Sequence, residues 1–63
     1  MNNELTEIIN ELPDRQKEVC LLHFMEGLKY VDISERLNIS VNTIENHISR
    51  ALKTLRQKIR QYT

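Results

Sequence analysis

The amino-acid sequence predicts an all-α protein, a four-helix domain that contains a helix-turn-helix and ends in one long helix. Apolar residues recur every three or four positions along most of the chain, and no stretch alternates apolar and polar residues as a half-buried strand would. The 63 residues include one glycine and one proline, so few positions interrupt helices. This length fits a single domain over residues 1–63.

The first helix is expected at about residues 3–11, because one of its faces is apolar. That face carries Leu5, Ile8, Ile9 and Leu12. Their spacing of i, i+3, i+4 and i+7 is typical of an amphipathic helix. Pro13 ends this helix and suits the first turn of the next, expected over 13–26, where its missing N–H costs nothing.

The second helix is expected to be central, because apolar side chains surround most of it. They are Val19, Cys20, Leu21, Leu22, Phe24 and Met25. Cys20 is the only cysteine, so it cannot form a disulfide within the chain, and we expect a buried thiol. Two histidines and one cysteine complete no zinc pattern, so neither a metal nor another cofactor is expected. Gly27 is expected to end the helix in the left-handed conformation.

A short third helix is expected over residues 30–37. Its inward candidates are Val31, Ile33 and Leu37. Asn38 then stands where a tight turn requires a positive φ, which Asn tolerates better than most residues. Ser40 is a good N-cap for the following helix.

The fourth helix is expected over residues 41–61, because its apolar stripe has no break. The stripe consists of Val41, Ile44, Ile48, Leu52, Leu55, Ile59 and Tyr62. Such a helix would be about 30 Å long. Its half beyond Ala51 is expected to pack against the first two helices, with Leu52, Leu55 and Ile59 in the core.

Charge is divided unevenly along a chain whose net charge is zero. Residues 1–39 carry four basic and eight acidic side chains, a net charge of −4. Residues 40–63 carry five basic side chains and the single acid Glu45, a net charge of +4. The last helix is therefore a basic rod, which favours an anionic partner for it despite the neutral total.

The third and fourth helices, joined by the segment NIS, have the layout of a helix-turn-helix. Apolar residues that would lock the two together are Ile33, Leu37, Ile39, Ile44 and Ile48. Ser34 is small at the position where the two helices cross closely, and Asn38 replaces the glycine commonly found at the turn. A plain helical hairpin is the alternative interpretation.

The segment from Leu12 to Ile59, LPDRQKEV…FMEGLKYVDISERLNISVNTIENHISRALKTLRQKI, resembles region 4, the C-terminal DNA-binding region of bacterial RNA polymerase sigma factors. The extracytoplasmic-function type is the most similar. A rival resemblance is to the LuxR-type response-regulator domain, which shares a helix pair followed by S..T…H. The opening LP and the long continuation RALKTLRQKI favour the sigma factor.

The resemblance implies that the fourth helix is a recognition helix that enters the major groove of the promoter minus-35 element. Candidates for contact with bases are Asn42, Glu45, Asn46, Ser49 and Arg50. At 100° per residue, most of these lie opposite the apolar stripe. The Asn46 amide fits adenine N6 and N7, and the Arg50 fork fits guanine O6 and N7. Glu45 stands where sigma factors often carry a basic residue. Its carboxylate either accepts a hydrogen bond from the cytosine N4 amino group or repels phosphate.

A second set of residues is placed to hold DNA phosphates. It consists of Lys29, Tyr30, Ser40, Thr43, His47 and Lys53, to which Asn42 can be added. Backbone N–H groups at the starts of the third and fourth helices can contribute. Lys29 stands where the family usually has Ser or Thr, which loses a capping bond but places a charge near the DNA. His47 has the alternative of packing against the bundle.

The sequence contains no activated nucleophile, paired acid and base, or phosphate-binding glycine loop, so we expect no enzyme. The resemblance implies double-stranded promoter DNA and the β-subunit flap of RNA polymerase core as partners, with an anti-sigma factor as a further one. A helical module bound mainly by protein is the alternative function. We expect a monomer in the cytoplasm with no membrane contact. A working sigma factor also needs region 2, which melts the promoter, and 63 residues cannot hold it, so we expect a domain of a longer sigma factor.

Overall fold

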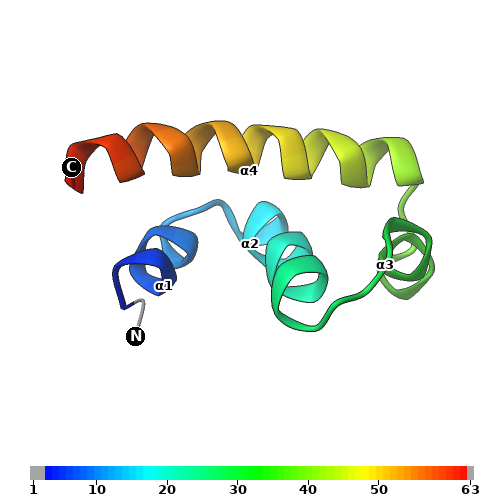
Figure 1. Ribbon diagram of the computed structural model, residues 1–63. Coiled ribbons are helices and arrows are strands. Elements are labelled where there is room, and N and C mark those ends of the chain that lie inside the picture. Colours follow the sequence, from blue (N-terminus) through cyan, green and yellow to red (C-terminus); the bar gives the residue numbers. More distant parts are fainter. Residues whose placement is uncertain (1–2, 63) are drawn as a thin grey trace.

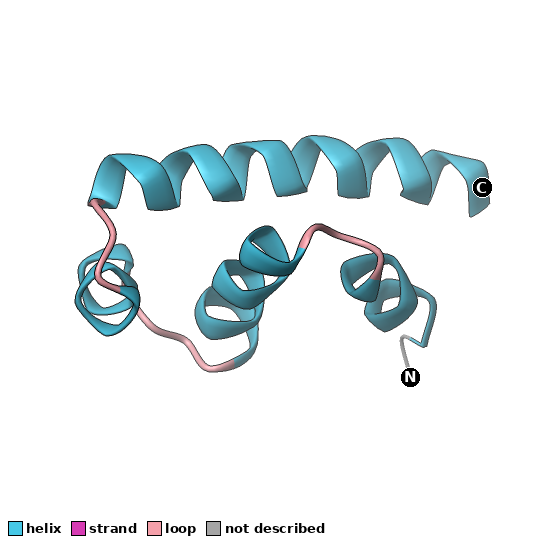
Figure 2. Cartoon of the chain, turned by 180° about the vertical axis from the view of Figure 1, so that it is seen from behind, coloured by secondary structure: helices cyan, strands magenta, loops and turns pink. Residues whose placement is uncertain are grey.

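The computed structural model describes the backbone of residues 3–62 and the side chains of residues 6–60. Its elements are α1 (Asn3–Asn10), α2 (Asp14–Cys20), the π-helix η1 (Leu21–Met25), α3 (Tyr30–Leu37) and α4 (Val41–Tyr62). The described residues contain no strand, which confirms the all-α prediction. Helix α4 runs along one side of the molecule, and the other helices lie in a row beneath it (Figure 1; seen from behind in Figure 2).

Pro13 separates α1 from α2 as predicted, but α2 begins at Asp14, one residue later than expected. Ile8 and Ile9 are buried, and Leu12 after the helix is buried with them. Pro13 lies just outside α2 with φ −53° and ψ 147°, and its carbonyl accepts from the Lys17 N–H at 2.9 Å. Helix ends assigned by different criteria differ by a residue or two, so this difference is minor. The expected core residues Leu5 and Tyr62 lie outside the described side chains.

The single helix expected over 13–26 changes its hydrogen bonding at Leu21. From there the chain forms a π-helix, in which the Glu26 N–H donates to the Leu21 carbonyl at 3.2 Å, five residues back. Gly27 ends the segment with φ 74°, the left-handed conformation expected of it. Helix η1 packs against α3.

Not every apolar side chain around η1 is buried, although the sequence predicts a central helix that apolar side chains mostly surround. Val19, Cys20 and Leu22 are buried, but Phe24 and Met25 are 51% and 65% exposed. These two side chains occupy the last two positions of η1. A 63-residue chain has too few elements to cover every apolar face of its central helix.

Helix α3 buries a narrower face than the sequence predicted. Ile33 is fully buried and Leu37, one turn later, is partly buried, whereas Val31 is 55% exposed. Residues i and i+2 of a helix do not share a face, so Val31 and Ile33 cannot both point inward. The inclusion of Val31 among the core candidates was therefore wrong.

The long helix α4 contacts each of the other three α-helices. Its fully or nearly fully buried positions are Ile44, Ile48, Ala51 and Leu55. Leu52 is only partly buried, and Ile59 is 44% exposed, so the expectation that both belong to the core was wrong. At 100° per residue, Leu52 and Ile59 lie at the edge of the stripe rather than at its centre. Val41, at the same edge, is also exposed.

This difference between Leu55 and Ile59 makes a testable prediction about stability. Leu55→Ala should lower the free energy of unfolding by about 2–5 kcal/mol, because it opens a cavity beneath α4. Ile59→Ala should cost clearly less, since its side chain already faces solvent on one side. Denaturant unfolding followed by circular dichroism measures both. Equal losses would show that the end of α4 is buried as deeply as its middle.

Candidate nucleic-acid interface

The turn between α3 and α4 positions the start of the long helix. Asn38 has φ 57° and ψ 46°, the left-handed conformation predicted for it. The Ile39 N–H donates back to the Ser34 carbonyl at 3.1 Å, which closes α3. Ser40 is the predicted N-cap: its Oγ accepts from the Thr43 N–H at 3.1 Å and lies 2.9 Å from Thr43 Oγ1.

The candidate base-contacting residues are all exposed on α4. They are Asn42, Glu45, Asn46, Ser49 and Arg50. Asn46 lies nearly opposite the buried stripe, flanked by Asn42 and Ser49 on one side and by Arg50 on the other. Glu45 is turned about 100° away from Asn46, toward the edge that carries Leu52. The five form one continuous arc of the α4 surface, with Glu45 at one edge, next to Ser49, and Arg50 at the other edge.

The candidate phosphate-contacting residues divide into two groups. Ser40, Thr43, His47 and Lys53 belong to the cap and surface of α4, where Thr43 and His47 are half-buried on the flank opposite Glu45. Half-burial of His47 fits both of its expected roles. In the cap the Ser40 hydroxyl makes two hydrogen bonds and the Thr43 hydroxyl makes one, so the Thr43 hydroxyl keeps bonding capacity for solvent or a ligand. Lys53 is exposed one turn beyond Ser49.

Lys29 and Tyr30 form the second group, at the start of α3. Lys29 is extended, with φ −76° and ψ 159°, and its side chain makes no capping bond, as expected from an ammonium group without an acceptor. Instead the Asp32 carboxylate accepts from the Lys29 backbone N–H at 3.3 Å. The sequence analysis missed this bond, although an acid three residues after an N-cap signals it. The Tyr30 ring is half-buried, with its centroid 4.9 Å from that of His23.

Ion pairs leave the outer face of α4 more basic than the rest of the surface. Arg15 pairs with Glu18 at 3.1 Å, Arg36 with Glu26 at 3.7 Å, and Lys58 with Glu11. Among the side chains that the structure describes, Arg50, Lys53 and Arg56 form no ion pair. The first two face outward, so their positive charge is available to an anion.

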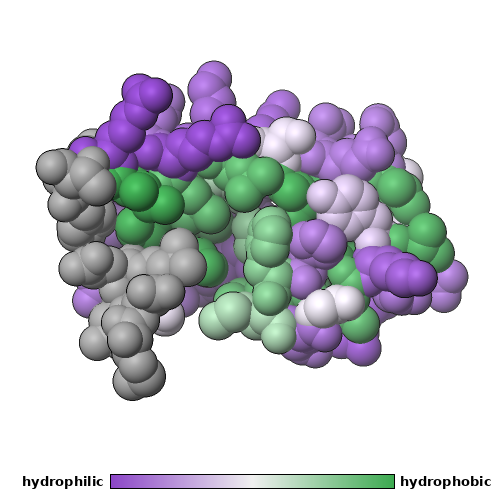
Figure 3. Space-filling view, in the orientation of Figure 1, coloured by the Kyte–Doolittle hydropathy of each residue, from purple (hydrophilic) through white to green (hydrophobic). Residues whose placement is uncertain are grey.

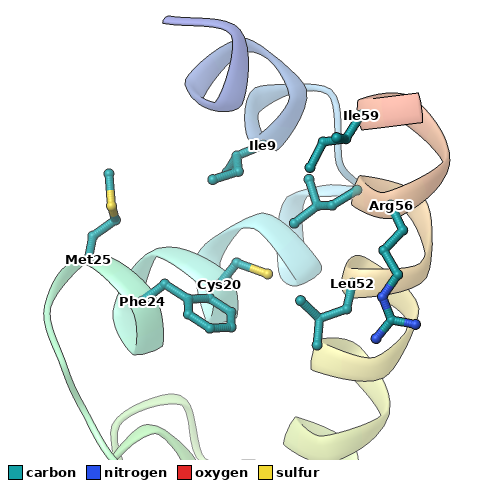
Figure 4. A pocket seen from close by; sticks show the side chains of 8 residues that line it. Ile9, Cys20, Phe24, Met25, Leu52, Arg56 and Ile59 are labelled. Atoms are coloured by element: carbon teal, nitrogen blue, oxygen red, sulfur yellow. The ribbon is translucent and has the colours of Figure 1, made fainter. Parts of the chain in front are cut away.

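A second surface was not predicted: an open apolar groove of about 300 Å³ between α1, the α2–η1 segment and the distal half of α4. Its lining comprises Ile9, Cys20, Phe24, Met25, Leu52, Leu55, Arg56 and Ile59 (Figure 4). Figure 3 shows apolar surface gathered beneath the hydrophilic row of α4. Most of these residues were expected in the core, and a surplus of large apolar side chains was the signal for this surface.

Cys20 is the one cysteine of the chain, and its side chain is buried in the core. Burial raises the pKa of the Cys20 thiol, so this sulfur stays protonated and poorly nucleophilic at neutral pH. No group of three His, Cys, Asp or Glu side chains within the described part of the chain is placed to hold a metal ion. None of the described helices is long and apolar enough to cross a membrane.

Helix α4 is basic, its N-terminus is capped, and a tight turn at Asn38 joins it to the short helix α3. This arrangement defines a helix-turn-helix domain of the DNA-binding class. Residues 2–55 match the family model described as Sigma-70, region 4. The chain therefore belongs to the region 4 family of sigma-70 factors, which favours the sigma resemblance over the LuxR-type one.

Curated relatives agree with this family. The chain is 33% identical over 60 residues to the ECF RNA polymerase sigma factor SigW of Bacillus subtilis, covering 95% of this chain and 32% of the relative. It is 38% identical over 55 residues to the RNA polymerase sigma factor SigV of the same organism, covering 87% and 33%. For the ECF RNA polymerase sigma factor SigK of Mycobacterium tuberculosis the identity is 36% over 52 residues, covering 82% and 28%. The chain thus spans about a third of these relatives, and no solved structure matches it.

The charge layout predicts how duplex binding depends on salt. If Lys29 and Lys53 each neutralise one phosphate, log affinity should fall against log salt with a slope of about −2. We expect affinity for unrelated duplex in the micromolar range or weaker at physiological salt. Fluorescence anisotropy across a salt series measures both quantities. Tight binding that salt does not weaken would contradict the assignment of these basic side chains to phosphate contacts.

Proposed function

We propose that this domain recognises the promoter minus-35 element through α4 and docks on RNA polymerase during transcription initiation. The observation that carries the proposal is the exposed polar row of α4, which lies opposite the buried stripe of the same helix. Because that stripe anchors α4 to the other helices, the polar row projects from a rigid support. The B-DNA major groove, about 12 Å wide, admits a helix presented in this way.

Asn46 and Arg50 are the proposed base-reading residues. They lie one turn apart on α4, about 6 Å along its axis, which corresponds to roughly two base steps. The Asn46 amide offers a donor and an acceptor that suit adenine, and the Arg50 guanidinium offers two donors that suit guanine. Asn42 and Ser49 flank them and would contact neighbouring bases or the edge of the backbone. Glu45 lies at the margin, where it accepts from a cytosine amino group or disfavours other sequences.

The proposed phosphate contacts hold the domain in register. The first turn of a helix leaves backbone N–H groups without a partner inside the helix. At the start of α3 these groups lie next to Lys29 and Tyr30, and at the start of α4 they lie next to Ser40 and Thr43. His47 and Lys53 extend the contacts along α4. Such contacts position a protein on DNA and supply sequence-independent affinity, whereas base contacts supply the specificity.

The apolar groove supports the second half of the proposal, a contact with an apolar helix of RNA polymerase. We propose the β-subunit flap as its occupant, as the sigma-factor resemblance implies. Phe24, Met25 and Ile59 expose large apolar surface at its rim, which in soluble domains marks partner sites. Arg56 adds a positive charge that suits an acidic residue beside the apolar face of that helix. An anti-sigma factor would compete for one or both surfaces.

The groove and the base-reading row occupy different parts of α4, so polymerase and DNA can be bound together. The groove uses Leu52 to Ile59 on the inward edge, and base reading uses Asn42 to Arg50 on the outward face. The relatives are three times as long as this chain, so promoter melting is assigned to other parts of a sigma factor. We propose that the domain acts as a monomer in the cytoplasm, where polymerase works.

Base reading predicts a contrast between variants. Arg50→Ala and Asn46→Ala should each cost about 1–3 kcal/mol on the preferred duplex and relax the preference at one base pair. Lys53→Ala should weaken all sequences alike and reduce the salt slope by about 1. Selection from random duplexes, followed by affinity measurements, tests this.

All three side chains are exposed, so the variants should fold, which circular dichroism verifies. The base-reading assignment is wrong if no motif emerges, or if Arg50→Ala behaves like Lys53→Ala.

Docking on polymerase predicts the opposite pattern. Phe24→Ser and Met25→Ser should reduce capture by core polymerase and leave affinity for the preferred duplex unchanged, since both side chains lie away from the outer face of α4. A pull-down with core polymerase and an anisotropy titration with duplex measure the two effects. Glu7→Gln, an exposed substitution on α1, tests whether the acidic side chains of the early helices hold polymerase instead. If Glu7→Gln reduces capture and the groove variants do not, the acidic side chains rather than the groove hold polymerase.

A further inference from the structure

Ser34 makes an unusual pair of contacts with the turn of the helix-turn-helix. This residue of α3 is half-buried, and its Oγ donates to the Ile39 carbonyl at 2.5 Å. The backbone carbonyl of the same serine accepts from the Ile39 N–H at 3.1 Å. One residue of α3 therefore holds both peptide groups of Ile39. The sequence indicates only that position 34 needs a small side chain; it does not reveal the hydroxyl bond.

Ile39 is the residue through which this contact reaches the recognition helix. It directly precedes Ser40, whose side chain caps α4 through the Thr43 N–H. Between the end of α3 at Leu37 and the capping Ser40 stand only Asn38, whose φ of 57° turns the chain, and Ile39 itself. Within the described residues, the Ser34 hydroxyl provides the one side-chain hydrogen bond that joins α3 to this turn.

The apolar contacts between α3 and α4 leave their relative orientation less well determined. Ile33 and Ile44 are fully buried and hold the helices together, but dispersion and burial have little directional preference. A hydrogen bond does, because it weakens steeply as its angle closes. Base reading requires side chains held within about 0.5 Å and 10–20° of a productive geometry.

We propose that Ser34 is a positioning residue for base reading, a role that rests on the proposed function. Its hydroxyl fixes the angle at which the Val41–Arg50 half of α4 leaves the turn. Asn46 and Arg50 then reach base edges while the start of α3 remains on the DNA backbone. Without the hydroxyl, the half-buried Ile39 carbonyl loses its partner, and the turn relaxes toward water to satisfy it. The Ile39 N–H bond and the apolar contacts remain, so the fold persists with a less defined helix angle.

The test compares Ser34→Ala, which removes one oxygen atom, with Ser34→Thr, which keeps the hydroxyl. Ile8→Val serves as a control that weakens the core from α1, far from the turn. Affinities for the selected duplex and for an unrelated duplex are measured by anisotropy at a temperature where all variants are fully folded. We expect Ser34→Ala to lower affinity for the selected duplex about threefold to tenfold and to leave the unrelated duplex unchanged. Ser34→Thr and Ile8→Val should keep the wild-type ratio of the two affinities.

Each other outcome rejects the proposal. An unchanged ratio in Ser34→Ala shows that the hydroxyl does not position the reading helix. A loss shared by Ser34→Thr assigns the effect to side-chain size, and a loss shared by Ile8→Val assigns it to stability. These results leave the proposed function standing if Arg50→Ala still relaxes the preference at one base pair. If the wild type selects no sequence at all, the proposed function and the role of Ser34 fail together.

Discussion

Burial of one stripe of α4 is the interaction on which the rest of this structure depends. Ile44, Ile48, Ala51 and Leu55 are the contacts through which the long helix joins α1, α2 and α3 into one core. Burying an aliphatic side chain of this size contributes about 1.5–3 kcal/mol, and a domain this small has few other sources of stability. The opposite face of α4 is polar because water, and in the proposed function DNA, lies there. Folding and recognition are thus two sides of one helix.

The same small size explains why the domain has a second surface. The short helices beneath α4 cover its proximal half more completely than its distal half, so an apolar groove remains open between α1, η1 and α4. Phe24 and Met25 at its rim are exposed although their residue types belong in a core. Charge separates in parallel, with acids on the early helices and unpaired bases on the outer face of α4. In the proposed function, DNA and polymerase therefore use different side chains of the domain.

The turn between α3 and α4 determines the direction in which α4 leaves the core. The left-handed Asn38, the capping Ser40 and the two bonds of Ser34 determine where α4 begins and at what angle. At the start of α3, the Lys29 backbone N–H donates to the Asp32 carboxylate. Affinity from phosphate contacts and specificity from base contacts would both depend on this short segment, since it relates one helix start to the other.

Local chemistry in the sequence determined the helix order, the left-handed positions Gly27 and Asn38, the cap at Ser40 and the polar row of α4, because each depends on residues a few positions apart. The family resemblance also lay in the sequence, whereas the roles of the individual contact residues stay predictions. Only the structure revealed the π-helical turn at Leu21 and the bond from Ser34 to Ile39, although both join residues five positions apart, and tertiary packing decided the exposure of Val31 and Ile59. The physical reason is that helical periodicity shows which face is apolar, but not how much of that face the neighbouring helices cover. That coverage depends on the angles at which distant segments pack, and in a chain this short it left an apolar groove that periodicity had assigned to the core.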